Sequence, residues 1–153
     1  MTSAEITAVA TQLIAEIEER IPACMQNPED RDNSHGNVTL MIIAEGGQIF
    51  GRMFGTDKRV RRGTCRTAWH KSTQVWMTGQ ATGRFEEKVY GQGVNPGQFG
   101  LMHPDLVGWD GGLPVVAADG TKFAVAMSGF TGVTDCNLIR EAVAAVPGLK
   151  MEE

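Results

Sequence analysis

The sequence predicts a protein of the α+β class, in which an antiparallel β-sheet carries flanking helices. Two apolar hairpin patterns, at residues 38–54 and 113–130, alternate with three amphipathic stretches that precede, separate and follow them. With 153 residues, of which 42% are hydrophobic and 21% charged, the chain can bury a core without metal or disulfide cross-links. No repeat or linker divides it, so we expect a single domain over residues 1–153.

The N-terminal helix is predicted by its cap and its periodicity. Thr2 followed by Glu5 is the pattern of a capping box, and apolar residues recur at helical spacing as far as Ile17. We expect this helix to run to about Arg20, because Pro22 ends or kinks it. The polar stretch "QNPEDRDNSHGN" that follows is expected to form a mobile surface loop.

Both hairpins are predicted from apolar strands joined by turn residues. Residues 38–44 form a buried apolar strand pattern, residues 45–47 (Glu-Gly-Gly) a turn, and residues 48–54 the return strand. The second hairpin, "LPVVAADGTKFAVAMSGF", has its turn at the Asp-Gly pair of residues 119–120. The two hairpins together supply the strands of the expected sheet.

The central helix is predicted for residues 58–77, with Thr56 and Asp57 as candidate N-caps. Its apolar stripe is thin and consists of Cys65, Trp69 and Trp76. We expect this stripe to face the core, because it is the only strongly apolar side of the helix.

The remaining helical signals are unequal in strength. Residues 80–110 carry no clear pattern beyond a short helical turn near residues 86–90. A closing amphipathic helix is expected after Thr134 or Asp135, with apolar residues at helical spacing up to Val146.

Positive charge is concentrated in an otherwise acidic chain. The formal net charge is -4, yet seven of the 14 Lys and Arg residues fall within residues 52–71. On a helix, Arg59, Arg62, Arg66 and His70 lie within an arc of roughly 80°. Arginines one turn apart repel each other unless anions lie among them. They either form a solvated face paired with acids elsewhere, or bind a small carboxylate or phosphate. Nucleic acid is a poor candidate, because the protein is acidic and carries no known nucleic-acid motif.

Two histidines are candidates for acid–base chemistry. On the arginine face, His70 is expected to be neutral and able to accept a proton or bind a metal. His103 lies in "MHPDLVGWDGG" near two carboxylates, and is either a general base or a residue with local hydrogen bonds. The candidate catalytic residues are His70, His103, Asp105 and Glu86. The candidate ligand-binding residues are Arg59, Arg62, Arg66, Trp69, Trp109 and Asp110. The sequence contains no recognised metal-binding motif, and we therefore assign no metal ligands from it.

Three cysteines bear on the compartment. Cys24, Cys65 and Cys136 are odd in number and widely spaced, which favours a reduced, cytoplasmic protein. No apolar run approaches the roughly 20 residues that span a bilayer, and the N-terminus lacks the pattern of a signal peptide. We therefore expect no membrane partner.

The C-terminal half resembles a known family. The stretch "GWDGGLPVVAADGTKFAVAMSGFTGVTDCNLIREAV" is similar to the GlcG/HbpS-like, or haem-degrading-domain, proteins. The match is carried by Gly111, Gly112, Pro114, Ser128, Gly129 and Asp135. "VTLMIIAEGGQIFGRMFG" resembles the first hairpin of that family, and "RVRRGTCRTAWHKS" occupies the place of the helix that follows it. Residues 80–110 look longer than the usual family pattern.

The resemblance implies a profilin-like or PAS-like sheet with flanking helices, assembly into homo-oligomers, and binding of haem or another tetrapyrrole. It maps no haem-ligand position onto this sequence. Three hypotheses remain open. The first is an oligomeric protein that binds a small ligand, with haem as the named candidate and an arginine-lined anion pocket. The second is an enzyme acting on a small carboxylate, in which arginines clamp the acid and a histidine moves a proton. The third is an interaction module that docks through its cationic helix.

Overall fold

The computed structural model describes residues 1–152 and contains an antiparallel sheet with strand order β2-β1-β4-β3-β5. The strands are β1 (Val38–Ala44), β2 (Ile49–Phe54), β3 (Gly112–Ala117), β4 (Lys122–Ser128) and β5 (Leu149–Met151). The helices are α1 (Ser3–Cys24), α2 (Pro28–Ser34), α3 (Lys58–Thr78), α4 (Thr82–Gln92) and α5 (Gly132–Ala145), with a 3-10 turn, η1, at Pro96–Phe99. The predicted α+β class is confirmed.

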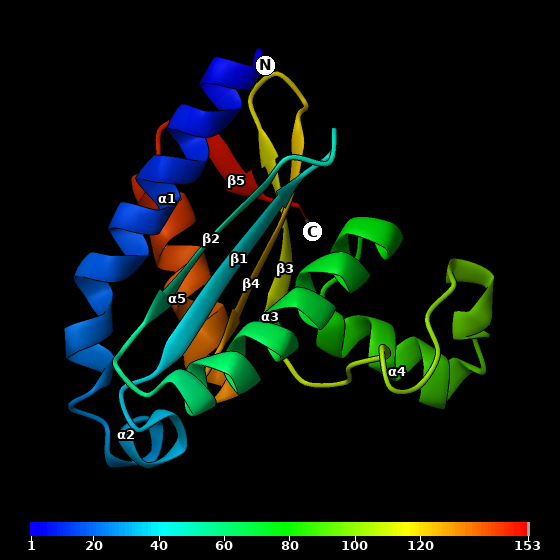
Figure 1. The fold of residues 1–153 in the computed structure, drawn as a ribbon. Helices are drawn as coiled ribbons and strands as arrows, with labels where there is room; N and C mark the ends of the chain where they lie inside the picture. The colour runs from blue at the N-terminus through cyan, green and yellow to red at the C-terminus, as the bar shows by residue number, and fades with distance from the viewer. Residues whose placement is uncertain (153) are drawn as a thin grey trace.

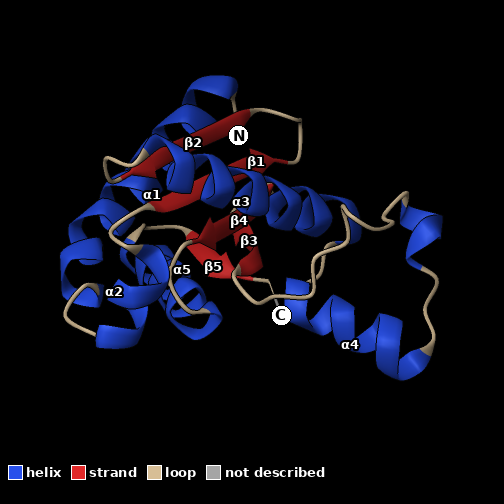
Figure 2. Cartoon of the chain, turned by 60° about the horizontal axis from the view of Figure 1, so that its bottom comes forward, coloured by secondary structure: helices blue, strands red, loops and turns tan. Residues whose placement is uncertain are grey.

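Helices cover both faces of the sheet. α1 and α5 pack together on one face, while α3 crosses the other and contacts β1, β4 and β3 (Figure 1). Figure 2 shows that α4, η1 and the loop leading to β3 project from this layered body as an arm. This arm separates α3 from the second hairpin in sequence, and it contacts the sheet at β3, where the Gly112 amide donates to the Thr82 hydroxyl at 3.2 Å.

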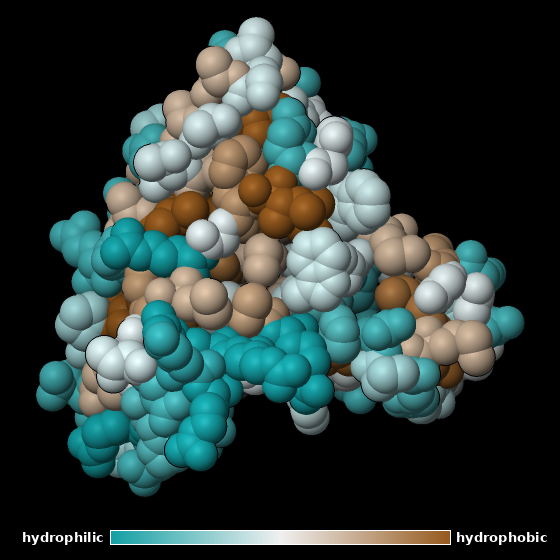
Figure 3. Space-filling model, viewed as in Figure 1, coloured by the Kyte–Doolittle hydropathy of each residue, from teal (hydrophilic) through white to brown (hydrophobic). Residues whose placement is uncertain are grey.

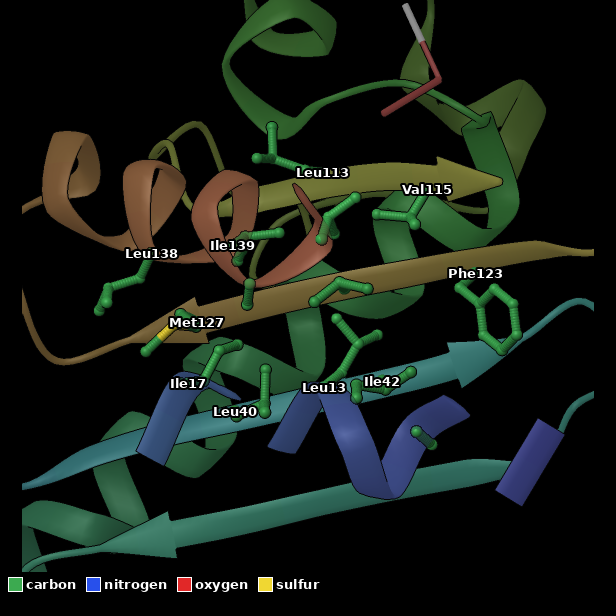
Figure 4. Close-up of a cluster of buried hydrophobic side chains, with 14 of the residues drawn as sticks. Leu13, Ile17, Leu40, Ile42, Leu113, Val115, Phe123, Met127, Leu138 and Ile139 are labelled. Atoms are coloured by element: carbon green, nitrogen blue, oxygen red, sulfur yellow. The ribbon is translucent and has the colours of Figure 1, made fainter. Parts of the chain in front are cut away.

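The main core lies between the sheet and the α1–α5 layer (Figure 4). Leu40 and Ile42 of β1 are fully buried against Leu13 and Ile17 of α1 and Ile139 of α5. Alternation along β1 explains this placement, because every second side chain of a strand points to the same face. Truncating one such leucine to alanine should cost about 2–5 kcal/mol.

The first helix is longer than predicted. It runs past Arg20 to Cys24 and holds Pro22 inside its last turn. Proline removes one N–H donor, but the Met25 amide still donates to the Ile21 carbonyl at 3.2 Å. So close to a helix end, one lost hydrogen bond does not stop the last turn from forming.

The predicted loop at residues 26–37 was also wrong, because it contains α2. Asn27 caps this helix and Pro28 occupies its first turn, where a missing N–H costs nothing. Asp30 is buried and accepts hydrogen bonds from the Thr131 amide at 2.9 Å and the Thr134 hydroxyl at 2.7 Å. α2 is therefore anchored to the start of α5.

The orientation predicted for the central helix was wrong. Trp69 and Trp76 remain 39% and 48% exposed, and Cys65 is half-buried on the same flank. The residues that α3 buries are smaller or polar: Ala68, Lys71, Ser72, Gln74 and Val75. Small side chains let the helix lie close to the sheet, and the two long polar ones find partners inside the protein.

The arm contains more helix than the predicted turn near residues 86–90. α4 forms because Phe85 packs with Leu101 and Leu106 in a small core of its own. Gln74 attaches the arm to α3, since its side-chain amide forms two 2.9 Å hydrogen bonds with the backbone of Val107, one as donor and one as acceptor. Long-range contacts of this kind leave no periodic signal in the sequence.

The C-terminal helix starts slightly earlier than predicted. Thr131 is its N-cap and accepts from the Thr134 amide at 3.3 Å, so α5 begins at Gly132. After the helix ends, β5 pairs with β3 at the sheet edge, a strand that the sequence analysis missed.

Candidate functional site

A cavity of about 1050 Å³ lies between α3, α2 and the start of α5, and we call it the α3–α5 cavity. One side of α3 lines it, from Val60 to Lys71, together with the strand-to-helix loop at residues 128–133. The cavity is therefore built where β4 ends and α5 begins. Ligand sites are common in such crevices at the ends of sheet strands.

A buried ion pair closes the floor of this cavity. Lys71 and Asp135 are 3% and 1% exposed, and both line the cavity. The Lys71 ammonium donates to Asp135 Oδ2 at 3.3 Å and to the Met127 carbonyl at 2.9 Å. Within residues 1–152, Asp135 Oδ1 is buried and forms no hydrogen bond of good geometry, although the Phe130 N–H lies close enough to the carboxylate to favour its ionised form. The pair is thus a desolvated cation and carboxylate at the cavity floor, with one carboxylate oxygen whose hydrogen-bonding capacity is unmet.

Burial controls the protonation of this acid. Removal from water raises the pKa of Asp135 to about 7, and the charge of Lys71 only partly opposes the rise. Near neutral pH the carboxyl group is therefore present in both protonated and ionised forms. A group poised in this way can accept or donate a proton.

Gly111 makes room for the ion pair. Its φ is +118°, and a Cβ there would lie 2.5 Å from Lys71 Nζ, 2.9 Å from the Met127 carbonyl oxygen and 3.1 Å from Asp135 Cβ. Only glycine fits both the backbone conformation and the space. The family-like Gly-Gly at residues 111–112 thus has a structural reason in this chain.

The N-terminus of α5 adds backbone donors to the cavity wall. Gly132 and Val133, its first two residues, line the cavity, and within residues 1–152 their N–H groups donate no hydrogen bond. The helix dipole places partial positive charge at the same point. Together with Lys71, these groups make the deep end of the cavity suitable for an anionic group.

Carboxylates surround the mouth of the cavity. Glu29 and Asp32 line it from α2, and both are exposed. Asn33 of α2 fixes their position, because its side-chain amide donates to the carbonyls of residues 129 and 130 at 3.0 and 2.8 Å. The rim is therefore acidic although the floor is cationic.

Trp109 and Asp110, two predicted ligand-binding residues, line the same cavity from the opposite side. Trp109 is 71% exposed, and its carbonyl accepts from the Thr82 hydroxyl at 2.7 Å. Asp110 lies against the start of α5, since a Cβ on Gly132 would be 2.9 Å from its Cβ. The arm thus supplies a carboxylate and an indole to the cavity mouth.

The predicted arginine face does not line this cavity. Arg59, Arg62 and Arg66 are exposed, and none of them forms an ion pair with an acid within residues 1–152. Figure 3 shows the surface over the N-terminal half of α3 as hydrophilic. Trp69 lies on the other flank of α3, away from the cavity lining.

The predicted acid–base residues fall into two groups. His70 Nε2 lies 3.6 Å from Asp105 Oδ1, so the arginine face does meet the arm at this point. His103 is exposed and lies 3.2 Å from the Tyr90 hydroxyl, beside an open pocket of about 480 Å³ that also includes Met102. Glu86 is half-buried, packs against Gly108 and makes no hydrogen bond or ion pair with either histidine.

Sequence reasoning missed Lys71 and Asp135 as a pair. The sequence places Lys71 in the cationic stretch, and it indicates Asp135 as a candidate N-cap and as part of the family-like motif. The burial of Lys71 could have been predicted from a helical projection, because Lys71 lies on the same side of α3 as Ala68 and Val75. A lysine among small and apolar neighbours indicates a buried cation that needs a carboxylate.

Two further searches over residues 1–152 gave negative results. Across that range, no three His, Cys, Asp or Glu side chains are grouped so that they could hold a metal ion. Nor does any helix in this range have the length and apolar character needed to cross a membrane.

Comparison with known proteins rests on shape. No protein-family model and no curated protein matches the sequence. Among solved structures, the PduOC–haem complex matches with a TM-score of 0.67 at 14% identity, over 100% of this chain and 99% of that chain. The Klebsiella pneumoniae protein ORFY, of family DUF336, matches with a TM-score of 0.62 at 20% identity, over 90% and 86%. HbpS matches with a TM-score of 0.61 at 15% identity, over 91% and 87%.

These matches define the class of fold. The chain has the GlcG/HbpS-like fold, which confirms the resemblance predicted from its C-terminal motif. The low identities restrict the comparison to the fold.

Proposed function

We propose that this protein binds a small polar ligand in the α3–α5 cavity. The observation that carries the proposal is the buried Lys71–Asp135 pair, whose Oδ1 atom lacks a partner. A buried ion pair contributes little net stability, because desolvation offsets the attraction of its charges. A titratable pair of this kind at the floor of an open cavity is typical of a ligand site.

An NMR titration tests this proposal on the intact protein. Adding pentanoate, a small carboxylate, should shift the amide signals of Gly132 and Val133 in a saturable way. Lys71→Met should weaken the effect, because it removes the buried cation. Shifts centred elsewhere, or an unchanged titration in the variant, would show that the cavity is not the site.

Haem binding is a second candidate, favoured by two of the fold neighbours. One is a haem complex by its title, and the other is HbpS, whose name the GlcG/HbpS-like family that the sequence resembles carries. The α3–α5 cavity does not fit haem, because no His, Met or Cys lines it and the carboxylates at its mouth would repel propionates.

The pocket beside His103 fits a tetrapyrrole better. It offers an imidazole and the thioether of Met102, together with the apolar side chains of Val89 and Leu106. An imidazole or thioether can coordinate haem iron, while the apolar side chains can contact the macrocycle. A haem bound in this pocket would supply an iron ion, which one of these two side chains would coordinate.

A haemin titration followed by absorbance tests this second candidate. The parent should show a saturable Soret shift, and His103→Ala should weaken it. His70→Ala is the matched control, since His70 lies outside that pocket. Equal titrations of all three proteins would overturn the assignment of His103.

The arginine face supports a third, enzymatic candidate. Arg66 is one helical turn before His70, and His70 is 3.6 Å from Asp105. An Arg, a His and an Asp placed in this order could clamp a small carboxylate and move a proton on it. This candidate and the arginine-lined anion pocket remain proposals, and a test is given in the Discussion.

Homo-oligomer formation is proposed from an exposed apolar face. Ile49 and Met53 of β2 and Trp69 and Trp76 of α3 are each between 39% and 53% exposed. Figure 3 shows hydrophobic residues gathered near the centre of this face, over the strands and beside α3. Exposed apolar patches of this kind are typical of subunit contacts. A native mass that equals one chain at micromolar concentration would contradict the proposal.

The cytoplasmic location is proposed on the cysteines. Cys24, Cys65 and Cys136 are all free thiols in the structure, which suits a reducing compartment. Microscopy of a tagged full-length chain would test it.

A further inference from the structure

We infer that the α3–α5 cavity selects zwitterionic ligands, with a carboxylate at its floor and an ammonium group at its rim. This inference rests on the ligand-binding function proposed above and specifies the chemical class of the ligand. It follows from an uneven distribution of charge between the deep and the exposed ends of one cavity.

The floor of the cavity recognises an anionic group. Lys71 is buried and supplies the only cationic side chain among the lining residues. Gly132 and Val133 present backbone N–H groups without acceptors at the positive end of α5. A carboxylate can accept from several such donors at once, which makes these hydrogen bonds short and strong.

Asp135 adds discrimination at the same point. Its Oδ1 atom is buried and forms no hydrogen bond within residues 1–152, so the protein carries the cost of its desolvation even without a ligand. When Asp135 is protonated it can donate to a ligand carboxylate, whereas the ionised form would repel that carboxylate. Binding of the anionic end should therefore favour the protonated acid.

The rim recognises a cationic group. Glu29 and Asp32 are exposed on α2, and Asp110 lies on the arm across the mouth. Arg31 Nε lies 3.8 Å from Asp32 Oδ1 and partly offsets its charge, but among the described lining residues none at this level is cationic, so the carboxylates create a negative potential at the entrance. Trp109, also at the mouth, offers an aromatic face to an ammonium group.

The two ends together favour a zwitterion over simpler ligands. A plain carboxylate must pass three acidic side chains and gains nothing from them. A plain amine is attracted to the rim but leaves Lys71 and the α5 amides without an anion. A molecule that carries both charges, separated by a short chain, satisfies the floor and the rim, and a cavity of about 1050 Å³ has room for it.

Calorimetry with three matched probes tests the inference on the full-length protein. The probes are 5-aminopentanoate, pentanoate, which lacks the amine, and pentylamine, which lacks the acid. We expect 5-aminopentanoate to bind about tenfold more tightly than either of the others, since one charge-assisted hydrogen bond is worth about that factor.

Two variants test which residues of the cavity bind the ammonium end and which bind the carboxylate end of the ligand. The double variant Glu29→Gln with Asp32→Asn should weaken 5-aminopentanoate about tenfold and leave pentanoate unchanged or slightly tighter. Lys71→Met should weaken both acids and leave pentylamine unchanged. The control is Glu19→Gln with Glu87→Gln, which changes the net charge equally at exposed positions outside the cavity.

The possible outcomes separate the inference from the function on which it rests. If pentanoate binds as tightly as 5-aminopentanoate and Lys71→Met weakens both, the cavity binds ligands but does not select zwitterions. Equal weakening by the rim and control variants would also overturn the selection, because net charge alone would explain it. If no probe binds the parent at millimolar concentration, or if neither variant changes binding, both proposals fail. The rim variant alters only exposed residues, so the test remains decisive even if Lys71→Met does not fold.

Discussion

The stability of this protein should decrease as the pH rises from about 5 to about 7, because of Asp135. Its pKa is raised from 3.8 to about 7 in the folded protein, mainly by burial. In the unfolded chain the same carboxyl group is hydrated and ionises near its ordinary pKa. Between these two values the folded state holds a proton that the unfolded state has lost.

The sign of the effect follows from this difference in proton binding. The contribution of Asp135 to stability is fully present below pH 3.8 and is lost as the pH rises through about 7. The difference of about three between the folded and unfolded pKa values corresponds to a change of about 4 kcal/mol in the free energy of unfolding. Glu5, Asp57 and Asp119, whose pKa values are lowered, act in the opposite direction but only in the acid range. From pH 5 to pH 7 the loss should be about 2 kcal/mol, because half of the folded molecules still hold the proton at pH 7.

Urea denaturation at pH 5, 6, 7 and 8 measures this loss. The free energy of unfolding of the parent should decrease up to about pH 7 and then level off. Asp135→Asn keeps the shape of the side chain but cannot ionise, so it should remove most of the slope. In Lys71→Met the decrease should extend above pH 7, because the cation that favours the ionised form is gone.

A parent protein whose stability is constant or increases from pH 5 to pH 7, with the same profile in Asp135→Asn, would refute this reasoning. Such a result would mean that water reaches the carboxyl group and that the pair at the cavity floor is not desolvated. The cavity would then lack the feature on which its proposed function depends.

Three further predictions concern other parts of the structure. Gly111→Ala should destabilise the fold by about 3 kcal/mol or more, since its Cβ would collide with the buried ion pair. Gly120→Ala, at φ +89° with open space around it, should cost only about 1 kcal/mol, and urea denaturation of both compares the two sites. Thr131→Ala removes the N-cap of α5 and should cost about 1 kcal/mol in the same assay. Arg62→Ala or Arg66→Ala should leave the melting temperature unchanged but reduce the increase in melting temperature that phosphate or small carboxylates cause in the parent, as measured by thermal shift. A lower melting temperature or a smaller oligomer in these variants would instead indicate that the arginines pair with acids.

Local patterns in the sequence determined the four strands of the two hairpins and some of the helix ends. The apolar run at residues 38–44 defined β1, and the Asp119-Gly120 pair defined the turn between β3 and β4. The capping box at Thr2 marked the start of α1. These signals act over a few residues, so hydrogen bonds and side-chain alternation within one segment are sufficient to reveal them.

The tertiary structure alone decided which side of α3 faces the sheet. Trp69 and Trp76 are the most apolar residues of the helix, yet Ala68 and Val75 are buried instead. The close approach of α3 to the sheet leaves no room for indoles. A hydrophobicity pattern ranks side chains by polarity and cannot include the space that the opposing strands provide.

The candidate site was equally hidden, because its parts are far apart in the chain. Lys71 and Asp135 are 64 residues apart, and Asp30 reaches Thr131 across 101. Trp109 and Asp110 were predicted as ligand-binding residues and do line the cavity, whereas the arginines lie outside it. The order of the residues in the sequence determined that positive charge would concentrate on one helix. Only the packing of α3 against β4 and α5 decided that a single lysine would be buried and the arginines exposed, because burying a cation requires a carboxylate within reach.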